Sequence, residues 1–331
     1  MSLHFHKSTI TLIALALLTG ALLTSCNKET DDTETETGSG QRSGGGGGSD
    51  DPTPFDPTGT VGADALFSVS PTQQVKFATS NLMFHWQIAN GDTSYVWHFA
   101  DNAWDVCGKG NEAISRTCTT DIDLFGWGTG TMSWPPAQNN PTATNTKDSI
   151  YAHFTAGGDL IIGSQDDWGN CVTDPAGGRW RTLSQSEWHY LLRERECYRF
   201  AKAMVNDVNG LIIFPDEWTV PDGVKTPTKY NDTAAYYNAN YYTKDDWVRL
   251  AANGATFLPC TGYRVGGNVR LVNDYGAYWS SSLMHYADSI GFGAFATCFY
   301  QPQGDYNRGN VRTDIVNSLH EGHAVRLVKN Q

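Results

Sequence analysis

Three short stretches near the two ends of the sequence decide the fold class: Phe67-Ser68-Val69-Ser70, Gln74-Val75-Lys76-Phe77 and Ala324-Val325-Arg326-Leu327-Val328. In each of them apolar and polar residues alternate with a period of two, which is typical of a β-strand with one buried face. A turn that contains a proline separates the first two stretches. A sheet that pairs the N-terminal strands with the C-terminal strand would account for all three, and we expect this pairing.

Two helices are predicted between these strands. Residues 184–187, Ser-Gln-Ser-Glu, have the spacing of a capping box, in which the Ser hydroxyl and the Glu carboxylate bind free backbone N–H groups. Residues 188–192 then carry an apolar stripe with helical spacing. A second helix is predicted from Thr243, as its N-cap, to just before Gly254. Long segments rich in Gly and Trp separate these elements, so we expect an α+β fold with extensive loops.

The composition excludes several classes of protein. The chain has 331 residues, of which 40% are hydrophobic and 18% charged, so it can bury a core and is not disordered throughout. Its 34 Gly and 11 Trp are unusual for a helical enzyme, because helices favour Ala, Leu, Glu and Lys. The net charge is −12 and the basic residues form no run. We therefore expect no nucleic-acid partner.

Residues 1–25 predict a secretory signal peptide. Lys7 precedes an apolar stretch, residues 10–23, that is shorter than the roughly 20 residues of a transmembrane helix. The segment Leu23-Thr24-Ser25-Cys26 resembles the lipobox of bacterial lipoproteins, in which the Cys thiol receives a diacylglyceryl group before cleavage. We expect lipidation of Cys26, with palmitate among the acyl chains. The alternative is a plain signal peptide with a coincidental Cys.

Residues 26–64 are predicted to form a tether between the lipid and the folded part. They are rich in Thr, Glu, Asp, Gly and Pro, which cannot bury a core. Nine acidic and two basic residues between positions 27 and 64 contribute −7 of the net charge of −12. Acidic residues directly after the lipidated Cys resemble the export signal of Bacteroidetes surface lipoproteins. We therefore expect a lipid-anchored protein of the outer membrane that faces the cell exterior.

Residues 65–331 are predicted to form one domain, since every Trp lies after residue 80 and no second linker follows. An ordered set of motifs runs through this domain: Phe67-Ser-Val-Ser, Asp123-Leu-Phe-Gly-Trp-Gly, Trp180-Arg-Thr-Leu-Ser-Gln-Ser-Glu-Trp, Val208-Asn-Gly-Leu-Ile-Ile-Phe-Pro-Asp-Glu-Trp, Gly254-Ala-Thr-Phe-Leu-Pro-Cys-Thr-Gly-Tyr-Arg, Gly276-Ala-Tyr-Trp-Ser-Ser-Ser and Ala324-Val-Arg-Leu-Val. Together they resemble the Fibrobacter succinogenes major paralogous domain of Bacteroidetes lipoproteins, which belongs to the C-type lectin-like superfamily. The resemblance implies a C-type lectin-like fold with two helices, a small twisted antiparallel sheet and a large loop-rich face.

The same superfamily implies three kinds of function. Formylglycine-generating enzymes have a similar helix start, but they need two closely spaced catalytic Cys that bind copper, whereas Cys260 and Cys298 lie far apart. Calcium-dependent lectins have Trp-Asn-Asp where this chain has Trp279-Ser280-Ser281, which lacks the amide and carboxylate oxygens of that motif. Variable proteins diversified by retroelements display a mutable C-terminal stretch to their ligands.

The stretch from Tyr278 to Val325 resembles such a variable region and is the predicted ligand face. Tyr, Asn and Asp supply aromatic area and adaptable hydrogen bonds, as in antibody loops, and Arg can bind carboxylates or phosphates. The candidate ligand-binding residues are His285, Tyr286, Asp288, Tyr300, Asp305, Tyr306, Asn307, Arg308, Arg312 and His320.

Six Cys remain besides Cys26, an even number in an exported chain, so three disulfides are predicted. Proximity in the sequence favours the first of the pairs named below, and the expected pairing of neighbouring strands favours the second. The two remaining Cys form the third pair. The pairs are Cys107 with Cys118, Cys260 with Cys298, and Cys171 with Cys197. Free buried thiols are the alternative.

No catalytic, metal or cofactor site is predicted. Asp216-Glu217 and Asp245-Asp246 are paired carboxylates, as in glycoside hydrolases, but adjacent side chains usually point apart. The second pair also fits the first turn of a helix, where negative charge is favourable. His320 and His323 are three residues apart without an evident third ligand.

The sequence thus predicts a non-enzymatic, monomeric, surface-anchored lipoprotein with a C-type lectin-like domain for ligand binding or adhesion. Its partners would be the membrane, through the lipid, and an unidentified protein or glycan. Two alternatives stay open: a formylglycine-generating-like or carbohydrate-processing enzyme, and a structural subunit associated with fimbriae.

Overall fold

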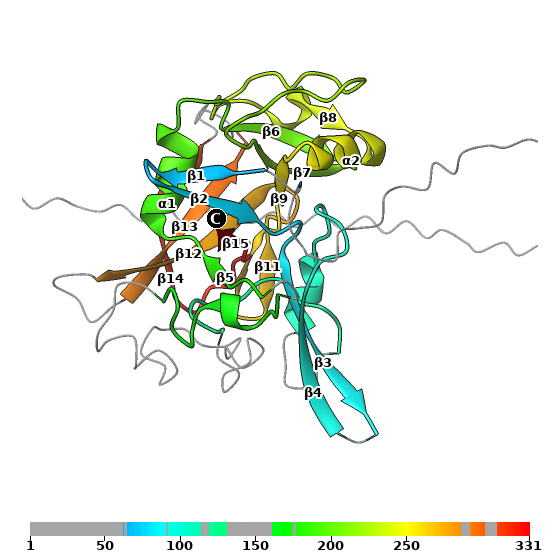
Figure 1. Cartoon of the computed structure of the whole chain (residues 1–331). Coiled ribbons are helices and arrows are strands. Elements are labelled where there is room, and N and C mark those ends of the chain that lie inside the picture. The colour runs from blue at the N-terminus through cyan, green and yellow to red at the C-terminus, as the bar shows by residue number, and fades with distance from the viewer. Residues whose placement is uncertain are drawn as a thin grey trace, which may run out of the picture. The chain divides into compact units, whose positions relative to one another are not determined.

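A four-stranded antiparallel sheet joins the first and the last strands of the described chain (Figure 1). Its order is β1 (Phe67–Ser70), β2 (Gln73–Phe77), β15 (Leu327–Asn330) and β5 (Trp180–Thr182). Val328 pairs with Phe77 on one side and with Arg181 on the other. The predicted pairing of the N-terminal strands with the C-terminal strand is therefore confirmed.

The computed structural model describes residues 62, 65–90, 92–113, 119–130, 161–174, 177–285, 292–301 and 310–331. All of them fall within one unit, Thr53–Gln331. The predicted signal peptide, Cys26 and the predicted tether, except for Gly62, lie outside the described residues.

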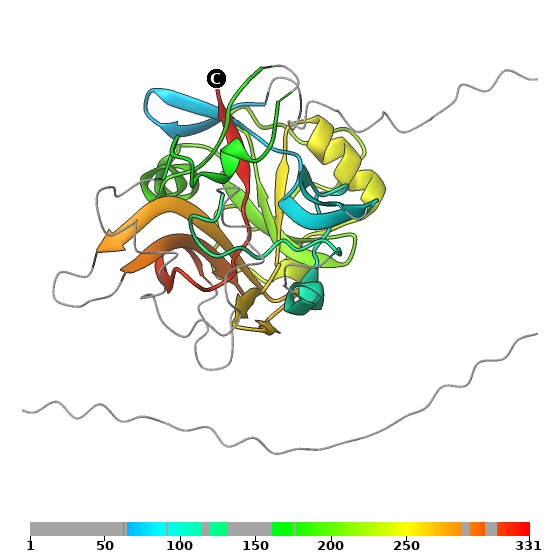
Figure 2. The same cartoon turned by 90° about the horizontal axis from the view of Figure 1, so that it is seen from below.

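Two further sheets and two hairpins make up most of the remaining regular structure in the described residues (Figure 2). The second sheet has the order β8 (Tyr241–Tyr242), β6 (Phe200–Val205), β7 (Val208–Ile213) and β9 (Thr256–Pro259). The third sheet has the order β12 (Tyr275–His285), β13 (Phe292–Tyr300) and β14 (Val311–Ser318). The hairpins are β3 (Leu82–Ala89) with β4 (Asp92–Phe99), and β10 (Tyr263–Val265) with β11 (Asn268–Arg270).

Both predicted helices form, and both begin at the predicted residue. α1 (Gln185–His189) has a complete capping box from Ser184 and continues as one π-helical turn, η5 (Tyr190–Glu194). α2 (Lys244–Ala252) starts after Thr243, and Gly254 follows its end with a φ of +94°. This left-handed conformation favours glycine and is typical of a helix C-terminus. Short 3-10 helices among the described residues are η1 (Gly108–Ala113), η4 (Trp168–Asn170) and η6 (Tyr237–Ala239).

The predicted C-type lectin-like α+β fold is wrong. Strand makes up 41% of the described structure and helix only 15%, and the strands form several small, separate sheets. Some of the segments between the predicted elements pair through their backbones, as the β3–β4 and β10–β11 hairpins do, whereas residues 126–128 and 215–218 are irregular as expected. The described part of the chain is therefore mostly β, and the two α-helices in it are short.

Three clusters of apolar side chains form the core. The first contains Trp127, Trp168 and Trp279, the second surrounds Trp188, and the third surrounds Trp247. The first four indole rings are fully buried, so these Trp are core residues. No helix in the described part of the chain combines the length and the apolar character needed to cross a bilayer.

The predicted disulfides are not formed where the structure describes both thiols. Cys171, Cys197, Cys260 and Cys298 are all free, which corrects the second and third predicted pairs. Individual thiols have other partners: Cys260 lies 3.1 Å from the Tyr237 hydroxyl, and Cys171 donates to a backbone carbonyl at 2.9 Å. Sequence order alone could not reveal these partners. Cys107 is also a free thiol, and its predicted partner Cys118 lies outside the described residues.

Candidate functional site

The structure describes only part of the predicted ligand face, at the two ends of the third sheet. His285 ends β12 opposite Phe292, whereas Tyr300 ends β13 opposite Tyr275. Eight residues of strand separate these two pairs, which corresponds to roughly 25 Å along the sheet. The structure therefore does not bring His285 and Tyr300 together. Six other candidates lie outside the described residues: Tyr286, Asp288, Asp305, Tyr306, Asn307 and Arg308.

The candidates with described side chains are half-buried, and two of them have clear partners within the protein. Tyr300 stacks on Tyr275 with ring centroids 6.0 Å apart, and its hydroxyl accepts a hydrogen bond from Asn310 at 2.8 Å. Arg312 donates two hydrogen bonds of 2.9 Å to the carboxylate of Asp314. These contacts explain how the two side chains are held within the sheet. His320 follows β14 in a half-buried turn.

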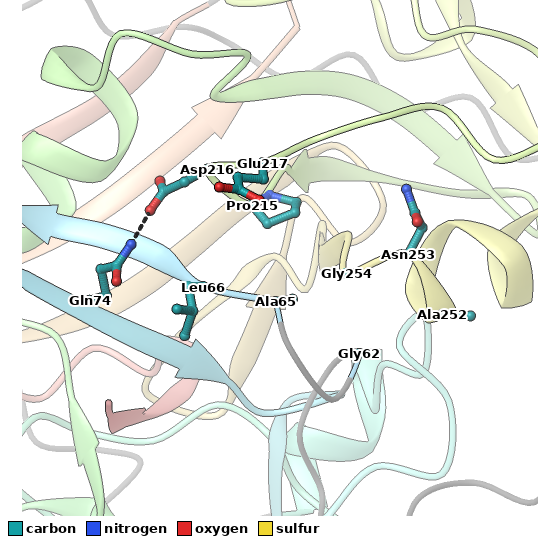
Figure 3. A pocket seen from close by; sticks show the side chains of 10 residues that line it. All are labelled: Gly62, Ala65, Leu66, Gln74, Pro215, Asp216, Glu217, Ala252, Asn253 and Gly254. Carbon is teal, nitrogen blue, oxygen red and sulfur yellow. Dashed lines mark hydrogen bonds between the residues drawn. The ribbon is translucent and has the colours of Figure 1, made fainter.

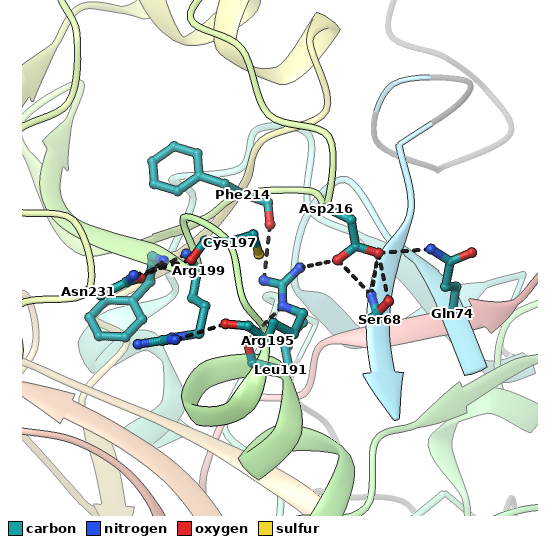
Figure 4. A network of polar contacts seen from close by, with 10 residues as sticks. Ser68, Gln74, Leu191, Arg195, Cys197, Arg199, Phe214, Asp216 and Asn231 are labelled. Atoms are coloured by element: carbon teal, nitrogen blue, oxygen red, sulfur yellow. Dashed lines mark hydrogen bonds and ion pairs between the residues drawn. The ribbon is translucent and has the colours of Figure 1, made fainter. Parts of the chain in front are cut away.

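Asp216 forms a polar network that connects three segments of the chain (Figure 4). Its carboxylate accepts hydrogen bonds from the Ser68 backbone at 2.9 Å, the Ser68 hydroxyl at 2.8 Å and the Gln74 amide at 2.8 Å. The buried guanidinium of Arg195 donates a fourth bond, also at 2.8 Å. Burial alone would raise the pKa of Asp216, but these hydrogen bonds outweigh it and lower the pKa below 3.8. Asp216 is thus a fully engaged, ionised structural group.

A cavity of about 540 Å³ lies beside this network, between the start of β1 and the end of α2 (Figure 3). The segments that line it include Ala65–Leu66, Pro215–Glu217 and Ala252–Gly254. Gln74 and Asp216 bind each other at its edge, and the Asn253 amide donates to the Thr219 carbonyl. Much of the polar lining is therefore engaged within the protein. This cavity offers few groups that could orient a ligand.

A second cavity, of about 400 Å³, also has Asp216 in its lining, together with the aromatic side chains of Tyr198 and Trp218. Tyr198 stacks on Tyr230 with centroids 4.1 Å apart, and Trp218 packs on Phe214 at 4.6 Å. The Trp218 indole N–H donates to the Tyr230 hydroxyl at 3.2 Å, which holds the two rings in fixed positions. We call Tyr198, Trp218 and Tyr230 the aromatic shelf. Tyr198 is 54% exposed, so part of its ring is open to solvent.

Polar groups surround the aromatic shelf. The backbone N–H of Arg199 donates to the Asn231 side chain at 2.8 Å, and the Asn231 amide donates to the Cys197 carbonyl at 3.2 Å. The Arg199 guanidinium donates to the Arg195 carbonyl at 2.8 Å, which fixes its direction. The carboxylate-bearing Glu196 is exposed at the same cavity. The cavity therefore combines aromatic surface with the cationic Arg199 and two anionic side chains, Glu196 and the engaged Asp216.

The thiol in this cavity is a poor nucleophile. Burial raises the pKa of Cys197 above its usual 9.0, and the effect is stronger than the stabilisation of the thiolate by Arg195. The thiol is therefore protonated at neutral pH, whereas nucleophilic Cys residues react as thiolates. Together with the engaged Asp216, this favours binding over covalent chemistry.

We compared this chain with known protein families, proteins and structures. No protein-family model, curated protein or solved structure matches it. The function must therefore follow from the chemistry of the described residues.

Sequence reasoning missed the aromatic shelf. Trp218 belongs to a Pro-Asp-Glu-Trp segment that was expected to be an irregular connection, and Tyr198 and Tyr230 lie 32 positions apart in the sequence. The available signal was a cluster of aromatic residues in polar, loop-like sequence. A second group missed from sequence has the spacing of metal ligands: His85, His98 and Asp121.

Proposed function

We propose that this chain is an exported, lipid-anchored binding or adhesion protein of the outer membrane that recognises saccharide ligands at the aromatic shelf. The observation that carries the proposal is the exposed ring of Tyr198, held by Tyr230 next to Trp218 in a cavity with polar edges. Export and anchoring rest on the signal sequence, on Cys26 and on the acidic tether.

A saccharide fits this surface by its chemistry. The C–H groups on one face of a sugar ring pack against an aromatic ring, while the hydroxyls at its edge need hydrogen-bond donors and acceptors. Arg199 can donate and Glu196 can accept at the edge of the aromatic shelf. A rigid aromatic ring also loses little conformational entropy on binding, which favours recognition by a small surface.

The carboxyl group of Asp216 in this cavity favours binding of a saccharide without its hydrolysis. A glycoside hydrolase needs one protonated and one ionised carboxyl group on opposite sides of the sugar bond. Asp216 is already bound by Ser68, Gln74 and Arg195, so it can neither attack a sugar nor donate a proton to it.

The proposal is tested by screening the purified full chain on a glycan array and measuring the affinity of the strongest ligand by calorimetry. We expect Tyr198→Ala to weaken that affinity by about fivefold, since a lost stacking contact costs on the order of 1 kcal/mol. Tyr198→Phe keeps the ring and should bind nearly as well as the original chain.

Tyr241→Ala is the matched control. Tyr241 is 47% exposed, similar to Tyr198, but it lies on β8 opposite Met204, away from the start of β6 where the cavity lies. It should bind the saccharide like the unmodified protein. The proposal fails if no glycan binds, or if Tyr198→Ala and Tyr241→Ala have the same effect.

A further inference from the structure

The β3–β4 hairpin has an aromatic face on the core and a second face that carries two histidines. Phe84 pairs with Trp97, and both pack in the first core cluster. Cross-strand partners share a face of a sheet, and the next residue along each strand points to the other face. His85 follows Phe84 and His98 follows Trp97, so both histidines lie on the face that points away from that cluster.

A third segment brings a carboxylate to the same face. The backbones of Ile122 and Phe84 exchange two hydrogen bonds, of 3.0 and 2.9 Å, as in a third antiparallel strand. Ile122 therefore shares the core face with Phe84. Asp121, one residue earlier, lies on the histidine face beside His85.

The three side chains converge at one point. Asp121 Oδ1 lies 2.7 Å from His85 Nδ1 and 2.9 Å from His98 Nε2. All three atoms lie within 4.8 Å of one another. Ligand atoms around a tetrahedral zinc ion are about 3.3 Å apart, so small side-chain rotations would suffice to admit an ion. The side chains are 28%, 31% and 39% exposed, which leaves the point accessible to solvent.

The hydrogen bonds of His98 favour a cation at this point. His98 Nδ1 lies 2.9 Å from the carbonyl oxygen of Phe99, which can only accept, so Nδ1 carries the proton. In a neutral ring, Nε2 then presents a lone pair to the Asp121 carboxylate, which is also an acceptor. Two acceptors 2.9 Å apart need a proton or a metal ion between them. A backbone carbonyl bound to the far nitrogen is the usual outer partner of a metal-binding histidine.

We propose that His85 Nδ1, His98 Nε2 and Asp121 Oδ1 bind a divalent transition-metal ion of the zinc class. Imidazole ligands favour zinc, copper and nickel, whereas calcium and magnesium favour sites built from oxygen atoms alone. Three protein ligands and solvent access leave one coordination position open for water or for a group of a bound partner. An ion here also links the hairpin to the segment at residue 121.

The test is a zinc titration of the untagged full chain after chelator treatment, followed by calorimetry. We expect one zinc ion to bind per chain. We also expect cobalt to compete with zinc for the site, and the absorption spectrum of bound cobalt should be that of a four-coordinate site with nitrogen and oxygen ligands. His85→Gln and His98→Gln should each weaken zinc binding by about 100-fold or more, since loss of an outer partner alone costs roughly 10–100-fold.

His189→Gln is the matched control, because His189 is also partly exposed and lies 3.5 Å from a carboxylate, that of Glu194. This variant should bind zinc like the unmodified chain. Equal weakening by all three substitutions, or no saturable zinc binding by the unmodified chain, would overturn the proposal. The cobalt spectrum of the unmodified chain gives an answer even if a variant fails to fold, since absence of four-coordinate absorption also overturns it.

Discussion

At the scale of single residues, the contribution of Asp216 to the stability of the fold can be measured. Asp216→Asn removes the charge opposite the buried Arg195 and replaces one acceptor with a donor. We expect a loss of about 2–4 kcal/mol in the free energy of unfolding at pH 7, measured by urea denaturation. Because folding lowers the pKa of Asp216 below 3.8, its contribution is complete above that pH and is lost as the pH falls through the folded-state pKa. The variant should therefore lose less stability in acid than the original chain.

The neighbouring Glu217 provides the control for this substitution. Its side chain is exposed, so Glu217→Gln should change the free energy of unfolding by less than about 0.5 kcal/mol. If Asp216→Asn is equally mild, or if both chains have the same stability profile in acid, the network does not stabilise the fold as described.

Arg326 illustrates how far sequence reasoning reaches for one residue. The alternation in residues 324–328 predicted a strand with a polar position at Arg326, and a polar position on such a strand normally faces water. In the structure Arg326 is fully buried, and it donates to the Asn81 side chain at 3.1 Å and to the carbonyls of Ala78 and Phe257 at 3.0 and 2.6 Å. These acceptors come from distant segments, so no local pattern could reveal them.

At the scale of elements, the helix starts were predictable because capping is local. In α2 the Thr243 hydroxyl accepts from the Asp246 backbone at 3.2 Å, while the Asp246 carboxylate accepts from the Thr243 backbone at 3.0 Å. Thr243→Ala should cost about 1 kcal/mol, measured by thermal unfolding. Combined with Asp246→Ala, the loss should be smaller than the sum of the two single losses, because each change breaks the same reciprocal pair. Additive losses would contradict the capping box.

The β3–β4 hairpin was missed although its turn was readable. Residues 89–92, Ala-Asn-Gly-Asp, contain the Asn-Gly pair that is the strongest short hairpin signal, and Asn90 has the φ of 54° that such a turn requires. A two-residue turn there would have placed His85 and His98 on one face from sequence alone. The approach of Asp121 depends on a bridge between Phe84 and Ile122, which is not a local feature.

At the scale of the whole molecule, the short motifs predicted individual strands and helices along the chain better than they predicted the fold class. The terminal strands pair as expected, yet the fold class was wrong, because weak motifs do not specify how the intervening segments pair with one another. The aromatic shelf was missed for the same reason. Phe214 contacts both Trp218 and Tyr230, which lie in separate loop segments, and the motifs do not specify this contact.

The lipid anchor proposed at Cys26 is tested on the whole molecule. We expect Cys26→Ser to move the chain from the detergent phase to the aqueous phase in a Triton X-114 partition and to abolish palmitate incorporation. The melting temperature should not change, because the apolar side chains that the structure describes in the core begin at residue 65. A variant that still partitions into detergent would refute lipidation at this residue.

The central position of β15 determines when the first sheet can form during folding. β15 pairs with β2, about 250 residues earlier, and with β5, so the first sheet cannot close until residue 330 is available. Such a long-range contact forms late, because the entropy of closing the chain must be overcome first. A chain that is exported as proposed above would therefore complete this sheet late. The strand order would keep the chain incompletely folded while it crosses a membrane.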